Sequence, residues 1–181
     1  MNQFEASIIL WIQENLRGVM DTFWIFVTHL GDEGYLWIAL GLSLLGFKKT
    51  RTVGIAVLLS LLLDLVIVNF TLKDLIGRPR PFVVNDAIQT LIKQPSAYKS
   101  FPSGHTSGSF AAAFALYRGV SKKIGIPVLI LAGLIAVSRL YVGVHYPTDV
   151  LAGVAVGLLC SFGAYFIIQI VRWKLEESRH A

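Results

Sequence analysis

Long apolar runs separated by short polar segments account for most of this chain. Six such runs are found, and three of them come close to or exceed the roughly 20 residues that a helix needs to cross a bilayer. The pattern therefore predicts an all-α fold, an integral membrane bundle of six transmembrane helices. The predicted spans are 18–30, 35–47, 52–72, 104–117, 124–142 and 149–173.

The first residues follow a different pattern. Across 4–16, apolar side chains such as Ile8, Trp11 and Ile12 are set against polar ones such as Glu5 at helical spacing. We expect a short N-terminal amphipathic helix that lies in the membrane interface.

One substantial loop interrupts the apolar pattern. Residues 77–103 are polar and are punctuated by prolines, including Pro79, Pro81 and Pro95. Neither a tandem repeat nor a low-complexity tract is visible in the sequence. The expected organisation is a single membrane-embedded domain over 1–181.

Composition supports the membrane assignment and excludes other classes. The chain has 181 residues, of which 55% are hydrophobic and only 15% charged, and its formal net charge is +5. A mean hydropathy of +0.65 excludes a disordered chain and an acidic binding module. The basic residues stand in clusters between apolar runs, which indicates membrane topology and argues against a nucleic-acid partner. Cys160 is the single cysteine, so neither an internal disulfide nor a metal site built on cysteines is expected.

The basic clusters predict an orientation. Three of them fall on one side of the predicted bundle, which should be cytoplasmic, so the chain would be a multi-pass protein of the plasma (inner) membrane with a cytoplasmic C-terminus. The opposite side also carries cations, which break the usual rule and need a reason. The cytoplasmic clusters are Lys48, Lys49 and Arg51; Arg118, Lys122 and Lys123; and Arg172, Lys174 and Arg179.

Three segments on the non-cytoplasmic side stand at predicted helix ends. Lys73 is followed seven residues later by Arg80-Pro81, and Pro102-Ser103-Gly104-His105 opens the next span. Ser138-Arg139 ends another span and is followed by His145 and Asp149. The helix directions bring all three segments to the same membrane face.

The cations of this group suit a phosphoryl group. Lys73, Arg80 and Arg139 can hold phosphate oxygens from several sides. The alternative is that they only extend toward lipid headgroups, as interfacial cations do. Ser103 and the N–H of Gly104 would add donors at a helix N-terminus, where the helix dipole favours an anion. The set predicts phosphoryl transfer without a metal ion and without a cofactor.

The two histidines suit covalent catalysis. A carboxylate four residues after His145, Asp149, would fix the tautomer of that imidazole so that its other nitrogen attacks. His105 would then protonate the leaving oxygen and activate water in a second step. A purely structural role for each histidine is the alternative.

These residues resemble a known family. The patterns that begin at Lys73, Pro102 and Ser138 match, in order and spacing, the three-part signature of the type 2 phosphatidic acid phosphatase superfamily, whose soluble relatives include vanadium haloperoxidases. The resemblance implies a membrane enzyme of six transmembrane helices that removes phosphate from lipid phosphates or diphosphates, without metal, through a phosphohistidine. It also implies the roles given above: phosphate binding by Lys73, Arg80, Ser103, Gly104 and Arg139, and catalysis by His105, His145 and Asp149.

The resemblance leaves the substrate open. The short chain and the turn at 31–34 are similar to small bacterial members that act on undecaprenyl diphosphate or phosphatidylglycerophosphate. We expect a lipid phosphatase with its active site on the extracytoplasmic side and undecaprenyl diphosphate as the first candidate. A phosphatidylglycerophosphate or phosphatidic acid phosphatase, a lipid phosphotransferase and a vanadate-dependent peroxidase are alternatives with the same site. A transporter or packing subunit that binds anionic lipids is the non-enzymatic alternative. The expected partners are the lipid substrate and membrane lipids, and the oligomeric state stays open.

Other polar residues receive separate interpretations. Asp64 is nine residues from Lys73, half a turn out of phase on an α-helix, so we expect it to lie away from the phosphate site. Asn69 is four residues before Lys73 on the same face, and it either supports the phosphate site or hydrogen-bonds between helices. A solvent or headgroup role is expected for Arg78, Lys93 and Lys99. For His29, Asp32 and Glu33 a polar turn is expected, and contact with a substrate headgroup is the alternative.

Overall fold

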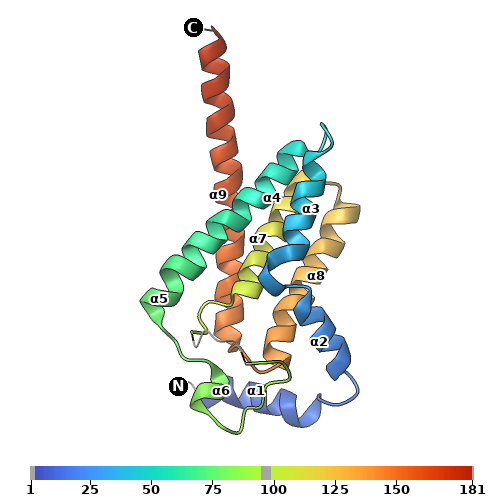
Figure 1. Cartoon of the computed structure of the whole chain (residues 1–181), viewed down its shortest axis with the longest axis vertical. Coiled ribbons are helices and arrows are strands. Elements are labelled where there is room, and N and C mark those ends of the chain that lie inside the picture. Colours follow the sequence, from blue (N-terminus) through green and yellow to red (C-terminus); the bar gives the residue numbers. More distant parts are fainter. Residues whose placement is uncertain (1–2, 95–98, 181) are drawn as a thin grey trace.

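The computed structural model describes residues 3–94 and 99–180, with side chains described to residue 178, so Pro95 of the predicted loop lies outside the described residues. Every regular element in these ranges is helical, and the one bridge found there joins Pro79 to Lys99. The fold is therefore mostly helical, as the apolar pattern predicted (Figure 1). The elements are α1 Gln3–Asn15, α2 Asp21–His29, η1 Asp32–Gly34, α3 Tyr35–Leu45, α4 Arg51–Asp64, η2 Leu65–Leu72, α5 Lys73–Ile76, α6 Pro81–Val84, α7 Gly104–Gly119, α8 Lys122–Tyr141 and α9 Pro147–His180.

Within the residues that the structure describes, three helices are long and apolar enough to cross a membrane. They are the continuous helix Arg51–Ile76, which comprises α4, η2 and α5, then Lys122–Tyr141, and Pro147–Ser178. The other helices of the predicted spans are shorter, with 9 residues in α2, 11 in α3 and 16 in α7. Membrane-spanning helices are thus present, whereas the number of six spans stays a prediction.

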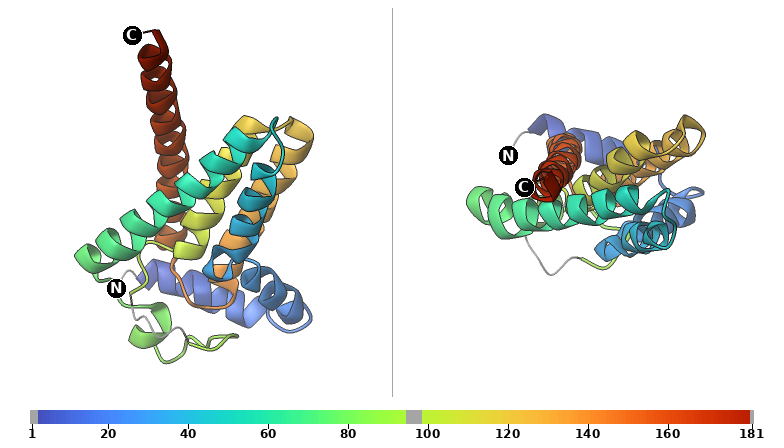
Figure 2. Two further views of the ribbon diagram at one scale, coloured as in Figure 1. Left: turned by 45° about the horizontal axis from the view of Figure 1, so that its top comes forward. Right: turned by 90° about the horizontal axis from the view of Figure 1, so that it is seen from above.

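Small residues allow α7 to occupy the middle of the bundle. Its alanines at 111, 112, 113 and 115 are fully buried, and it contacts α9, α8 and α4 (Figure 2). On α9, a Cβ added to Gly157 would meet the Ser107 carbonyl oxygen at 2.5 Å, and one added to Gly153 would meet the Ser103 carbonyl oxygen at 2.9 Å. The glycine spacing on α9 therefore serves close helix packing, which positions the N-terminus of α7 beside the start of α9.

The N-terminal helix α1 lies across the end of the bundle at which α9 begins (Figure 1). One face of α1 packs into a small core, where Ile9 is fully buried beside Val142, Val144 and Tyr146. Phe4 and Trp11 on its other face are exposed. The structure has a helix at these residues, and an amphipathic helix that lies in the membrane interface stays a prediction.

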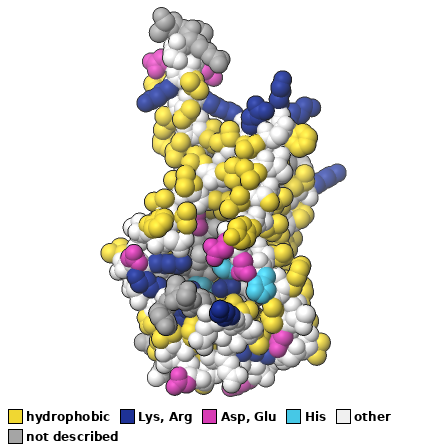
Figure 3. Space-filling view, viewed as in Figure 1, with side chains coloured by type: hydrophobic (Ala, Val, Ile, Leu, Met, Phe, Trp, Pro, Cys, Tyr) yellow, Lys and Arg dark blue, Asp and Glu magenta, His cyan; other side chains and the backbone are white. Residues whose placement is uncertain are grey.

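Charged side chains gather at two levels of the molecule (Figure 3). On the face shown, apolar side chains cover most of the surface between them. One group of lysines and arginines surrounds the end with the α3–α4 and α7–α8 connections, while cations, carboxylates and histidines meet in a hollow nearer to α1.

Candidate active site

A cavity of about 660 Å³ lies at the meeting point of the three sequence segments. Its polar wall is supplied by helix ends from different parts of the chain, and its other wall is supplied by leucines of α4 and η2. The structure thus brings together most of the residues singled out in the sequence. The predicted site residues that line the cavity are Asn69, Lys73, Arg80, Gly104, His105, Arg139 and His145.

Ser103 and Asp149 lie behind this wall and are fully buried. Ser103 is the N-cap of α7: its hydroxyl oxygen accepts hydrogen bonds from the N–H and the hydroxyl of Thr106, at 3.4 and 3.0 Å. Its own N–H donates to the Asp149 carbonyl oxygen at 3.1 Å. Ser103 therefore ties α7 to α9, and its predicted contact with phosphate stays a prediction.

Gly104 opens α7 beside the Lys73 ammonium group. A Cβ at this position would lie 3.5 Å from the Lys73 Nζ, so the glycine leaves the cation close to the helix N-terminus. The first N–H groups of an α-helix have no partner within the helix, and they carry the positive end of its dipole. The lysine and the helix end together form a positive surface facing the cavity.

Each cation of the cavity is held by a neighbour. The Lys73 Nζ donates to the Asn69 Oδ1 at 2.6 Å, which agrees with the placement of Asn69 on the lysine face. Arg80 donates to the Val144 carbonyl oxygen at 3.0 Å. Arg139 is 2% exposed and donates to the hydroxyl of Thr28 on α2. Thr28 was not singled out in the sequence, because a lone threonine in an apolar run carries no signal of its partner.

Arg80 also contacts the predicted nucleophile. Its NH1 lies 3.2 Å from the Nε2 of His145, a histidine that is 2% exposed. Burial lowers the pKa of Arg80 to about 10, which leaves the guanidinium charged at neutral pH. Burial also lowers the pKa of His145 well below its ordinary value, and the nearby Arg139 and Arg80 act in the same direction. His145 is therefore neutral near pH 7, the form in which an imidazole attacks.

The side chains of the predicted pair, His145 and Asp149, lie side by side, but the distance between them is longer than that of a normal hydrogen bond. The His145 Nδ1 lies 3.5 Å from the Asp149 Oδ2, and this nitrogen has no hydrogen-bond partner among the described residues. The same Asp149 oxygen accepts the Tyr146 N–H at 2.9 Å. Asp149 therefore stands beside the imidazole without a normal hydrogen bond to it.

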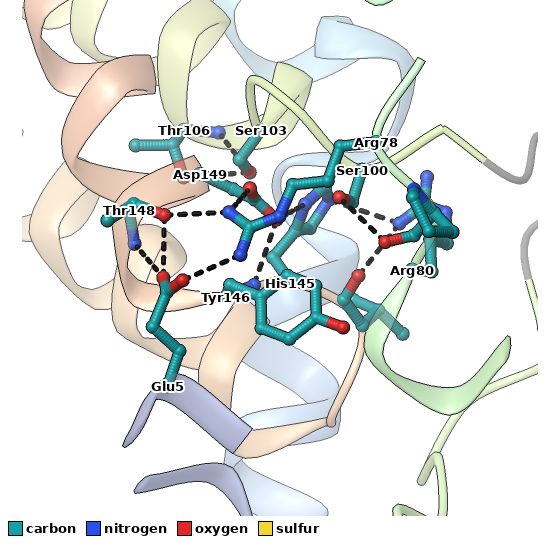
Figure 4. Close-up of polar contacts among 12 residues, drawn as sticks. Glu5, Arg78, Arg80, Ser100, Ser103, Thr106, His145, Tyr146, Thr148 and Asp149 are labelled. Carbon is teal, nitrogen blue, oxygen red and sulfur yellow. Dashed lines mark hydrogen bonds and ion pairs between the residues drawn. The ribbon is translucent and has the colours of Figure 1, made fainter. Parts of the chain in front are cut away.

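Arg78 forms an ion pair with the other carboxylate oxygen of Asp149 (Figure 4). The predicted solvent or headgroup role is therefore wrong for this residue. Its guanidinium is 2.7 Å from the Asp149 Oδ1 and 2.6 Å from the Glu5 Oε2 of α1. It also lies 3.9 Å above the Tyr146 ring centroid. Arg78 turns inward because two buried carboxylates need a cation, and Glu5 comes to this position only through the tertiary fold.

Glu5 joins the N-terminal helix to α9. Its Oε1 accepts the N–H and the hydroxyl of Thr148, at 3.0 and 2.6 Å (Figure 4). Burial alone would raise the pKa of Glu5, but the hydrogen bonds from Thr148 and the pairing with Arg78 lower it. An ionised Glu5 is thus part of the support beneath Asp149.

Asp32 contributes more than the polar turn expected from the sequence. Its Oδ1 lies 2.8 Å from the Nε2 of His105, and its Oδ2 lies 2.6 Å from the Nδ1 of His29. The hydrogen bonds with His105 and His29 lower the pKa of Asp32 to about 2. A Cβ at Gly31 would lie 2.9 Å from the His105 Cδ2, so this glycine lets the turn approach the imidazole.

Asp64 lines the cavity together with Lys73, so the prediction that it faces elsewhere is wrong. The prediction assumed an α-helix, on which nine residues make two and a half turns. Residues Leu65–Leu72 instead form a π-helix, whose i→i+5 hydrogen bonds turn the chain less at each residue. Two residues nine positions apart then fall close to the same face.

The described residues offer no group of three or more His, Cys, Asp and Glu side chains arranged to hold a metal ion. The binding capacity of the cavity lies instead in its lysine, its two arginines and the N-terminus of α7. Such a set of donors is suited to an anion with several oxygens.

Known proteins with similar sequences and folds agree with this chemistry. An undecaprenyl-diphosphatase from Sulfolobus acidocaldarius is 33% identical over 88% of this chain and 76% of its own. The undecaprenyl-diphosphatase BcrC from Bacillus subtilis is 36% identical over 86% of this chain and 79% of its own. A crystal structure of a PAP2 type phosphatidylglycerolphosphate phosphatase from Bacillus subtilis superposes with a TM-score of 0.75 at 26% identity, covering 93% of this chain and 86% of that chain.

A match to a family model confirms the resemblance found in the sequence. The relatives confirm the prediction of an enzyme that removes phosphate from lipids. The model of the PAP2 superfamily matches residues 53–173, which include all three motif segments. The chain therefore belongs to the PAP2 superfamily.

Proposed function

We propose that this protein hydrolyses undecaprenyl diphosphate at the extracytoplasmic face of the plasma membrane, without metal and through a phosphohistidine. The observation that carries the proposal is a cavity lined by Lys73, Arg80 and Arg139, in which Arg80 contacts the Nε2 of a buried, neutral His145. Relatives named as undecaprenyl-diphosphatases support the choice of substrate.

In the proposed first step, the cations hold the terminal phosphate while the Nε2 of His145 attacks its phosphorus. The P–N bond forms as the bond to the bridging oxygen breaks, and His105 gives a proton to the leaving lipid monophosphate. Water then attacks the phosphohistidine, the P–N bond breaks, and the water proton passes to His105. The products are undecaprenyl phosphate and inorganic phosphate.

The apolar wall of the cavity supports a lipid substrate. Leu58, Leu61, Leu62 and Leu65 line it on the side of α4 and η2. Leu62 and Leu65 are also exposed, so this wall continues to the outer surface of the bundle. A long prenyl chain would lie along that wall while its headgroup meets the cations.

The proposal includes six spans, with α1 lying in the interface and the C-terminus in the cytoplasm. The basic residues of the α3–α4 and α7–α8 connections stand at the end of the bundle away from α1 and the cavity (Figure 3). The excess of cations in short loops favours the cytoplasm for that end. The exposed Phe4 and Trp11 of α1 suit an interfacial helix.

The experiment is a phosphate-release assay on purified protein in detergent with EDTA. Undecaprenyl diphosphate, phosphatidylglycerophosphate and phosphatidic acid are given separately, and we expect the highest kcat/KM with undecaprenyl diphosphate. His145→Ala should abolish release and any acid-labile phosphoenzyme. Release from none of the three substrates would contradict the proposal, as would full activity of His145→Ala.

Phosphatidylglycerophosphate is the second candidate substrate, because the crystal structure of a phosphatase for that lipid shares this fold over most of both chains. A preference for it in the same assay would replace undecaprenyl diphosphate and leave the mechanism intact. Transfer to an acceptor alcohol in place of water would appear as a phosphorylated acceptor among the products.

A further inference from the structure

Two carboxylates of the structure face the two histidines of the cavity. Asp149 stands behind His145, and Asp32 contacts His105 from the turn η1. The Asp32 contact is the shorter one, 2.8 Å against 3.5 Å. Only the Asp149 pair is part of the motif spacing, whereas Asp32 is 73 positions from His105 in the sequence.

We propose that Asp32 is a positioning residue for His105. The carboxylate of Asp32 accepts the Nε2–H of the His105 imidazole and favours the protonated, acid form of that ring. The proposal rests on the proposed function, because it assigns the partner of the general acid in the same reaction. A carboxylate that accepts one ring N–H fixes the tautomer and orientation of the imidazole. The Nδ1 is then the nitrogen that exchanges a proton with the leaving oxygen and with water.

The surroundings of His105 explain why a carboxylate is needed. Arg139 on α8 and Arg80 before α6 line the same cavity, and positive charge close to an imidazole disfavours its protonated form. Asp32 is the carboxylate within hydrogen-bond distance that acts in the opposite direction. Other titratable groups on the cavity wall are Lys73, Glu33, Asp64 and His145.

Asp32 also connects His105 to the surface. Its second oxygen lies 2.6 Å from His29, and the side chains of His29 and Asp32 are 56% and 44% exposed. The carboxylate stays ionised in the working pH range because its pKa is about 2. After the leaving group has taken a proton from His105, the attacking water restores it, so each cycle leaves His105 as it began.

The backbone of the turn is shaped for this contact. Gly31 precedes Asp32, and a side chain at Gly31 would collide with His105 and with Ile135 of α8, at 2.9 and 2.8 Å. Gly34 has a left-handed backbone with φ of 69°, which directs the chain from the turn into α3. The two glycines place Asp32 against the ring edge of His105 that carries Nε2.

The test compares Asp32→Asn with wild type and with Asp86→Asn, an exposed carboxylate in the loop after α6 that undergoes the same change. Each protein is given undecaprenyl diphosphate, phosphatidylglycerophosphate and p-nitrophenyl phosphate between pH 5 and 9. Phosphatidylglycerophosphate expels a strongly basic alkoxide that needs a proton, and p-nitrophenyl phosphate expels a weakly basic phenolate that does not. Melting in detergent is recorded for each variant.

We expect Asp32→Asn to lower kcat with phosphatidylglycerophosphate about 100-fold and with p-nitrophenyl phosphate less than about threefold. Asp86→Asn should match wild type with both substrates. Equal losses on all substrates would overturn the proposal, as would wild-type behaviour of Asp32→Asn. Absence of phosphate release by wild type from all three substrates would instead overturn the proposed function.

Discussion

His145 shows how burial and nearby charge act together on one imidazole. The ring is 2% exposed, and its Nε2 contacts a guanidinium. Both conditions penalise a proton on the ring, so the pKa of His145 lies well below the ordinary value. The side chain is thereby kept in the form that can attack phosphorus.

A buried, neutral His145 should not take up a proton as the pH is lowered to 5. We expect the ring resonances of His145 in NMR spectra of histidine-labelled protein to stay unchanged between pH 8 and pH 5, whereas an unperturbed histidine titrates near 6.5. The resonances are assigned with His145→Ala. A titration midpoint of His145 at or above pH 6.5 would contradict the burial argument.

The same state of His145 affects stability. Since the unfolded chain takes up a proton below about pH 6.5 and the folded ring does not, this residue lowers the stability of the protein as the pH falls through that value.

At the level of elements, Arg78 is one of the links between the N-terminal helix and the site. Arg78 pairs with Glu5 of α1 and with Asp149 of α9 at 2.6 and 2.7 Å, and both carboxylates are buried. A residue that neutralises two buried carboxylates stabilises the fold mainly because its loss leaves both unpaired. The attachment therefore concerns stability and the alignment of Asp149 together.

Replacement of this cation should be costly. We expect Arg78→Met to lower the free energy of unfolding by about 3 to 5 kcal/mol and to reduce kcat, since Asp149 loses its partner. Thermal melting in detergent and the phosphate-release assay measure the two effects. The control is Lys99→Met, which removes an exposed pair with Asp74 at 2.6 Å and should cost less than about 1 kcal/mol. Similar melting of the two variants would show that the Arg78 pairs contribute little.

The packing of α7 on α9 gives a second prediction at this scale. A Cβ at Gly157 would lie 2.5 Å from the Ser107 carbonyl oxygen and 2.8 Å from the Ala111 nitrogen, and backbone atoms cannot move aside locally. Gly157→Ala should therefore destabilise the protein by about 1 to 3 kcal/mol, despite the better helix propensity of alanine. Gly133→Ala on α8 is the control, because its Cβ meets nothing within 4 Å. A Gly157→Ala protein that melts no lower than Gly133→Ala would refute the close-packing argument.

At the scale of the whole molecule, lysines and arginines lie at the end with the α3–α4 and α7–α8 connections, and the cavity with its mixed charges lies nearer to the other end. This arrangement predicts the orientation in the membrane. Cys160 is the single cysteine and is buried, so a Cys160→Ala background accepts new cysteines one at a time. In intact cells, we expect a membrane-impermeant maleimide to label Asp86→Cys in the loop after α6 and to leave Lys122→Cys unlabelled. Permeabilised cells, in which both should react, provide the control. Labelling of Lys122→Cys alone in intact cells would mean that the orientation is reversed.

Local patterns were sufficient for much of this protein. The long apolar helices can be predicted from the sequence because each depends on residues a few positions apart. The motif residues from Lys73 to Asp149 could be assigned to one cavity because helix directions alone bring span ends to a common face. The sequence by itself thus determined the helical membrane class, the family and most of the cavity wall.

The tertiary structure decided which groups act on those motif residues. Asp32 reaches His105, and Glu5 reaches Arg78, across 73 positions of sequence in each case, so no local pattern could indicate either contact. Asp64 faces the cavity because the π-helix between it and Lys73 changes the rotation that an α-helix would impose. Contacts between distant segments and departures from regular helical geometry depend on packing of the whole chain, and they determine how the charges of this site are balanced.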